Sequence, residues 1–180
     1  MKKLLIFTLT AAMLLSLAAC AQSAKPAAEP EQTAQTETTE KTDTENVQIP
    51  NPWTDYDSQS DAAQAAGFDL AAPEEISGCA EKSYRVLNAD GDVMFEIIYA
   101  SGEDEAARVR KAPGADDVSG DYNAYDEVNS VDVGGVSVTM KGAGGLVNLA
   151  VWTTGDYSYA LSVEAAISQS DMAALVADIA

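Results

Sequence analysis

The sequence contains no histidine, two cysteines, and 10 lysines and arginines against 29 aspartates and glutamates in 180 residues. Histidine is the commonest general base and the commonest metal ligand, so its absence excludes catalytic triads and metal centres that depend on imidazole. The formal net charge of −19 leaves few cations for phosphate contacts, which argues against binding to nucleic acid or anionic lipid surfaces. We therefore expect a protein that is not an enzyme and does not bind nucleic acid.

Long hydrophobic runs are also missing, apart from one at the N-terminus. Lys2 and Lys3 precede a stretch from Leu4 to Leu17 that is almost entirely apolar. A basic start, a short apolar segment and small residues are typical of a secretory signal. The stretch is shorter than the roughly 20 residues that a transmembrane helix needs. We expect residues 1–19 to be a signal peptide.

The signal ends in Leu17-Ala18-Ala19-Cys20, which resembles the lipobox of bacterial lipoproteins. In that family the cysteine thiol receives a diacylglyceryl group, signal peptidase II cuts before it, and the cysteine becomes the mature N-terminus. The resemblance implies lipidation at Cys20 and a protein anchored on the extracytoplasmic face of the cell membrane, because two acyl chains hold a protein there stably. The alternative is an ordinary secretory signal with an incidental cysteine.

Lipidation of Cys20 would leave Cys79 as the remaining thiol, so the mature chain could form no intramolecular disulfide. Cys79 is then either a reactive thiol or a small, partly buried apolar group. Loss of the signal peptide, with Lys2 and Lys3, would move the formal net charge from −19 to −21.

The chain after Cys20 divides by composition. Residues 21–50 contain no aromatic residue and almost no branched aliphatic residue before Val47 and Ile49. Such a segment buries too little apolar surface to offset the entropy of ordering. We expect residues 20–50 to form a disordered tether rich in Thr and Glu, and residues 51–180 to form one globular domain, a length that supports a single hydrophobic core.

The middle and end of the domain alternate apolar and polar residues, a pattern that predicts strands. Asp90-Gly91 favours a type I′ turn and predicts a hairpin between residues 84–88 and 93–99. Residues 107–111 fit either a strand or a helix. Three later stretches have apolar faces formed by Val136, Val138 and Met140, by Val147, Leu149 and Val151, and by Tyr157, Tyr159, Leu161 and Val163.

Two segments carry helix signals. Asp57 or Ser58 is suited to cap an alanine-rich stretch that stops at Gly67. Ser168 and Asp171 have the spacing of a capping box before a final stretch with helical periodicity. We expect an α+β domain, in which a curved antiparallel sheet of about six strands packs with this C-terminal helix and the short N-terminal helix.

Several distinctive strings run through the domain: Ala66-Gly67-Phe68 with Pro73, Asp90-Gly91, Arg108 to Ala112, Ser119 to Asn123, and Trp152 to Tyr159. Together they resemble an uncharacterised domain of unknown function. That domain recurs in lipoproteins and other exported proteins of Gram-positive, largely clostridial, bacteria. The resemblance implies an extracytoplasmic domain but no reaction, so it assigns no functional residue.

Arg108 and Arg110 are two of the six basic residues after Pro50. On a strand they would share one face, where two guanidinium groups are suited to bind a carboxylate or phosphate. The alternative is ordinary surface ion pairing, because acidic residues are abundant throughout the chain.

The acidic loop from Asp116 to Glu127 gathers oxygen ligands that suit calcium. Asp116, Asp117 and Asp121 are its candidate ligands, although their spacing does not match an EF-hand. The alternative is a solvated acidic loop that binds no metal.

Aromatic residues supply a third set of candidates. Tyr122 and Tyr125 lie in the acidic loop, and Trp152 lies on the last hairpin with a parity opposite to that of Val147, Leu149 and Val151. An exposed Trp152 could stack on a sugar or on a partner protein, since Trp, Tyr and Arg are enriched in binding hot spots. The alternative is burial of Trp152 in the core.

Two functions remain open. The first is a membrane-anchored lipoprotein that acts as a non-enzymatic interaction or accessory module of the cell envelope and engages an envelope protein. Its candidate partner face comprises Arg108, Arg110, Tyr122, Tyr125 and Trp152. The second is a lipoprotein that binds a small ligand or calcium. Beyond the lipid expected on Cys20, we expect no cofactor.

Overall fold

The computed structural model describes residues 51–179. The predicted signal peptide, Cys20 and the predicted tether lie outside this range. In the part of the chain that is described, no helix is both long enough and apolar enough to cross a membrane. The elements follow in the order β1 (Trp53–Tyr56), α1 (Gln59–Ala66), β2 (Glu81–Ala89), β3 (Asp92–Ser101), β4 (Asp104–Pro113), β5 (Glu127–Val133), β6 (Val136–Ala143), β7 (Leu146–Thr154), β8 (Tyr157–Ser168) and α2 (Gln169–Ile179).

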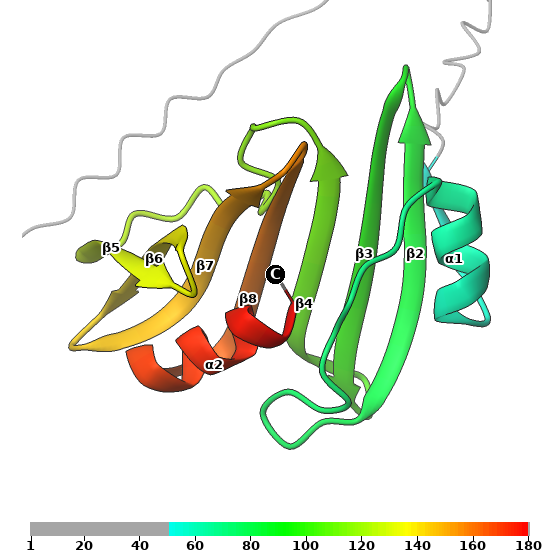
Figure 1. The fold of residues 1–180 in the computed structure, drawn as a ribbon. Helices are drawn as coiled ribbons and strands as arrows, with labels where there is room; N and C mark the ends of the chain where they lie inside the picture. The colour runs from blue at the N-terminus through cyan, green and yellow to red at the C-terminus, as the bar shows by residue number, and fades with distance from the viewer. Residues whose placement is uncertain (1–50, 180) are drawn as a thin grey trace, which may run out of the picture. The chain divides into compact units, whose positions relative to one another are not determined.

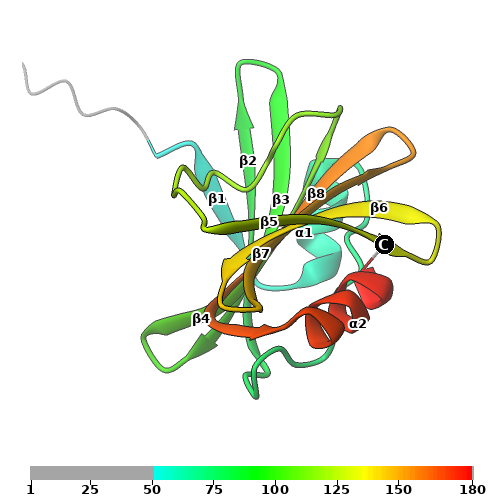
Figure 2. The ribbon, with the colours of Figure 1, turned by 90° about the vertical axis from the view of Figure 1, so that its left-hand side faces the viewer.

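All the strands pair antiparallel in one open sheet, in the order β1-β2-β3-β4-β8-β7-β6-β5 (Figure 1). Each half of the sheet is a meander of four consecutive strands, and the halves join where β4 pairs with β8. In Figure 2, β5 and β6 run across the direction of β2 and β3, which shows that the sheet is strongly twisted. Residues 51–179 are therefore mostly β, with two helices.

An antiparallel sheet with two helices is confirmed, but the expectation of about six strands was too low. The structure has eight strands within residues 51–179. Both strands that sequence patterning missed are edge strands: β1 has only four residues, and β5 is largely exposed. An exposed edge strand needs no regular apolar face, so it gives a weak alternating signal.

The hydrophobic core lies between the sheet and both helices, on what we call the helix-covered face. Helix α1 packs against β1 to β3, and α2 packs against β7 and β8 (Figure 2). Burial of this face supplies the main driving force for folding. Its most deeply buried large side chains include Tyr99, Phe95, Ile97, Met140, Leu161 and Met172.

The predicted local signals form as expected. Asp90 and Gly91 have φ angles of 56° and 95°, as a type I′ turn requires, and they join β2 to β3. The Ser58 hydroxyl accepts the Asp61 N–H at 3.1 Å and caps α1, and Gly67 ends this helix at φ 82°. The Ser168 hydroxyl accepts the Asp171 N–H at 3.1 Å and caps α2. Residues 107–111 belong to a strand, β4.

Candidate functional site

The sheet face opposite the helices, which we call the open face, is half covered by a loop. Residues 114–126, the β4–β5 loop, connect a central strand to the far edge of the sheet. Val118 from this loop, with Tyr125 beside it, packs in a small apolar cluster with Leu149 and Ala160. The loop therefore covers the β7–β8 side of the open face and extends over β4, because Ala112 belongs to the same cluster.

A buried carboxylate organises the β2–β4 side of the open face. Glu96 on β3 is 0% exposed, although it lies on the open face. Arg85 on β2 and Arg110 on β4 stand directly opposite it in register. The Arg85 Nε forms an ion pair with it, Arg110 Nε lies 2.5 Å from Glu96 Oε2, and Arg108 Nε lies 3.5 Å from the same oxygen. Three guanidinium groups thus surround one carboxylate.

Trp53 completes this cluster. Its ring centroid lies 4.6 Å from Arg85 Cζ and 5.8 Å from Arg110 Cζ, within cation–π distance. Arg108 and Arg110 share one face, as predicted, but their shared partner is the chain's own Glu96. The ion pairing is more deeply buried than the surface pairing that the sequence suggested as an alternative.

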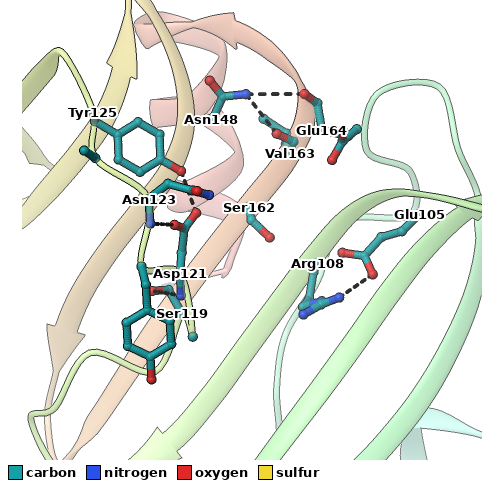
Figure 3. A pocket seen from close by; sticks show the side chains of 13 residues that line it. Glu105, Arg108, Ser119, Asp121, Asn123, Tyr125, Asn148, Ser162, Val163 and Glu164 are labelled. Carbon is teal, nitrogen blue, oxygen red and sulfur yellow. Dashed lines mark hydrogen bonds and ion pairs between the residues drawn. The ribbon is translucent and has the colours of Figure 1, made fainter. Parts of the chain in front are cut away.

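An open groove of about 570 Å³ lies beside Arg108, between the β4–β5 loop and strands β4, β7 and β8 (Figure 3). Arg108 lies at one side, where its Nη2 bonds the Glu105 carboxylate at 2.5 Å. Asn148 at the other side donates hydrogen bonds of 3.2 and 3.3 Å to the carbonyl oxygens of Val163 and Glu164. Polar side chains thus predominate in this groove.

The wall of the groove is fixed to the sheet through Arg110. Its Nη1 donates to the Ser119 carbonyl at 2.5 Å and to the Val118 carbonyl at 3.3 Å. The next residue, Gly120, has a φ angle of 65°, and a Cβ there would lie 2.6 Å from that same nitrogen. The backbone conformation therefore favours glycine, and any larger residue would displace the end of the Arg110 side chain.

Internal hydrogen bonds also occupy two acidic side chains of the loop, Asp117 and Asp121. The Asp117 carboxylate accepts the Ser119 N–H at 2.9 Å and pairs with Lys141 at 3.2 Å. The Asp121 carboxylate accepts the Asn123 N–H at 2.7 Å and the Tyr125 hydroxyl at 2.5 Å. These contacts tie the loop to itself and, through Lys141, to β6.

The candidate calcium ligands are not gathered into one centre. Across residues 51–179, no three acidic or cysteine side chains are grouped so as to hold a metal ion. Asp117 and Asp121 have the separate partners described above, and Asp116 is exposed. Calcium binding by these residues stays a prediction.

The pairing of Asp121 with Tyr125 makes a pH-dependent contribution to stability. The Tyr125 hydroxyl is the main cause that holds the pKa of Asp121 below its ordinary value of 3.8. Burial, followed by the bond to Asp121, raises the pKa of Tyr125 to about 12, so the phenol stays protonated at neutral pH. A carboxylate whose pKa is lowered by folding adds stability above its unfolded pKa and loses it as the pH falls through its folded pKa.

Replacing Tyr125 with phenylalanine should therefore lower the free energy of unfolding by about 1 kcal/mol at neutral pH, the usual value of one hydrogen bond. The difference between the two proteins should shrink as the pH falls below 3.8, the ordinary pKa, and through the lower pKa of folded Asp121. Urea unfolding of both proteins at neutral pH and at about pH 3 measures this difference in the free energy of unfolding. A difference that stayed constant with pH would show that the hydroxyl acts independently of the Asp121 charge.

The candidate aromatic residues separate in the structure. Tyr122 is 98% exposed and Tyr125 is half-buried, and both line the groove. Trp152 is only 4% exposed on the helix-covered face, where it stacks on Tyr159 with ring centroids 5.3 Å apart. The placement of Trp152 on an exposed partner face was therefore wrong, and the core alternative holds.

An irregular register in β7 explains this outcome. The pairing of β7 with β8 shifts between Val147 and Leu149, as in a β-bulge. Val147 therefore packs in the helix-covered core with Trp152, whereas Leu149 packs on the open face. The expectation that Val147 and Leu149 share one face was wrong, because a bulge reverses the alternation of side chains.

Cys79 lies away from the groove. It is half-buried and packs against the helix-covered core, as the apolar alternative expects. Its Sγ lies 3.9 Å from the Ser77 carbonyl oxygen, a weak contact.

No protein-family model, curated protein or solved structure matches the chain. The resemblance to a domain of exported clostridial proteins therefore stays a prediction. The case for a function depends on the groove, on the loop that walls it, and on the N-terminal signal.

Proposed function

We propose that the protein is a lipoprotein of the cell envelope, anchored through Cys20 on the extracytoplasmic face of the membrane. In this proposal its domain is a non-enzymatic interaction module, and the groove between the β4–β5 loop and the sheet receives part of an envelope protein. The observation that carries the proposal is the exposure of Tyr122, a large aromatic side chain that is 98% exposed beside the groove.

The rigidity of the loop favours a binding role for Tyr122. Its neighbour Asp121 is held by two hydrogen bonds, and Ser119 is held by Arg110. A preordered loop loses little further entropy on binding, and the ordering of loops is one of the costs that weaken association. Exposed tyrosines on such supports are common hot spots of protein interfaces.

The charges of the groove favour a basic partner segment. Its carboxylates are Glu105, Asp121 and Glu164, and its single guanidinium, Arg108, is already paired with Glu105. The groove therefore carries a net negative charge in a strongly acidic chain. Lysine or arginine side chains of a partner would find carboxylates there, and the ring of Tyr122 offers a cation–π surface.

Replacing Tyr122 with alanine should reduce capture of the partner by about tenfold or more, the effect of losing a hot spot worth about 1.4 kcal/mol. Crosslinking of the full lipoprotein in intact cells, with quantification of the enriched proteins, measures this. Val128→Ala is a matched control, since Val128 is exposed on β5 away from the groove. This variant should capture as much of the partner as the unaltered protein does.

Cys20→Ser tests the anchor in the same experiment, because loss of the lipid should release the protein from the membrane fraction.

Equal capture by Tyr122→Ala and the unaltered protein would contradict a role for the groove. Capture that disappears with a calcium chelator, but not with Tyr122→Ala, would favour the cation-binding alternative.

A further inference from the structure

A second hollow lies on the open face, at the end that carries the β2–β3 turn. This hairpin-end groove has a volume of about 410 Å³. Leu87 and Met94 line it from the hairpin, and Ala112 and Val118 line it from β4 and the β4–β5 loop. Ala112 and Val118 are buried, but Leu87 and Met94 remain half-exposed. An apolar hollow of this kind gains stability when an apolar side chain fills it.

The chain enters the domain beside this groove. Trp53, the first residue of β1, stands opposite Leu87 in the register of the sheet. An extended chain spans about 3.3 Å per residue, so the four residues back to Ile49 reach about 13 Å. Ile49 precedes Pro50 and Asn51 precedes Pro52, and a residue before proline is restricted to extended conformations. The segment before β1 is therefore suited to reach the groove.

The composition of that segment matches the groove. Val47 and Ile49 are the only branched aliphatic residues between Ala21 and Pro50, and they stand immediately before the domain. The segment Val47–Pro50 carries no charge, so it avoids repulsion from the acidic rim of the groove. Pro50 and Pro52 have no N–H to donate to β2, so side chains rather than added strand pairing must hold the segment.

We propose that Val47 and Ile49 dock in the hairpin-end groove of their own domain. Covalent attachment raises the effective concentration of the two side chains at the groove, so even a weak contact would be well populated. Docking would make the last residues of the tether part of the domain and would fix the direction in which the tether leaves it. This inference does not depend on the groove at Tyr122.

Photo-crosslinking tests the docking directly. The full chain carrying Cys20→Ser retains tether and domain without the predicted lipid site. Ile49→p-benzoylphenylalanine in this chain should crosslink within one molecule, mainly to Met94 or to neighbouring groove residues, as mapped by mass spectrometry. Ala34→p-benzoylphenylalanine, placed further back in the tether, should give at least several-fold less of that product. Equal yields from both positions, or products that join two molecules and vanish on dilution, would overturn the proposal.

Hydrogen exchange supplies a second measurement. In the double variant Val47→Asn and Ile49→Asn, the backbone amides around Met94 and Val118 should exchange several-fold faster than in the control Ala28→Asn with Ala34→Asn. Identical exchange in the two variants would overturn the proposal.

Discussion

Replacing Glu96 with glutamine should lower the free energy of unfolding by about 3 kcal/mol. Removal of one partner of a buried ion pair costs about 3–5 kcal/mol, because the remaining charge is left without compensation. The lower end of this range applies, because the side chains of Arg85 and Arg108 are each 27% exposed and can be partly hydrated. Urea unfolding at neutral pH, followed by circular dichroism, measures the change.

Glu105→Gln is the matched control. Glu105 also pairs with Arg108, but its side chain is 37% exposed, and exposed pairs contribute about 0–1 kcal/mol. If Glu96→Gln cost no more than Glu105→Gln, the arginine cluster would not depend on its buried carboxylate. Because Arg110 bonds both Glu96 and the Ser119 carbonyl, Glu96→Gln should also loosen the β4–β5 loop and weaken capture through Tyr122.

Replacing Trp152 with alanine should lower the free energy of unfolding by about 3–5 kcal/mol, the usual cost of truncating a buried aromatic side chain. Trp152 is buried in the helix-covered core and stacks on Tyr159 with their rings 6° from parallel. The alanine variant leaves a cavity in that layer and removes the stacking. Thermal and urea unfolding of the purified domain measure the loss.

Tyr122→Ala is the contrasting aromatic truncation. Its side chain is exposed, so its loss should change the free energy of unfolding by less than about 0.5 kcal/mol. The two variants thus separate a residue that stabilises the fold from one available for binding. A strongly destabilised Tyr122→Ala variant, or a Trp152→Ala variant of normal stability, would reverse these assignments.

Local signals explain which parts of the fold the sequence predicts. The turn at Asp90-Gly91 and the caps at Ser58 and Ser168 depend on the chemistry of two to four neighbouring residues, and all three form as expected. The shared face of Arg108 and Arg110 follows equally directly from the alternation of side chains along a strand. Such features are predictable because they need no knowledge of strand pairing.

Long-range register explains what the sequence does not predict. Glu96 pairs with Arg85 and Arg110, which stand 11 and 14 residues away in the chain on the strands either side of β3. Nothing near Glu96 marks it as the one carboxylate within residues 51–179 that becomes fully buried on the open face. Likewise, the shift between Val147 and Leu149, which puts Val147 on the same face as Trp152, depends on the pairing of β7 with β8.

The position where the chain enters the domain and the position of the groove at Tyr122 determine how the proposed module would bear mechanical load. Trp53 enters at the β2–β3 turn, whereas Glu105 and Glu164 line the groove at the opposite end of the sheet. A pull between a membrane anchor and a bound partner would therefore run along the strands. Under such a pull the hydrogen bonds between β1 and β2 are sheared together instead of being opened one after another. A tension in this direction would be resisted even by the four-residue edge strand β1. The same tension applied sideways would readily separate β1 from β2.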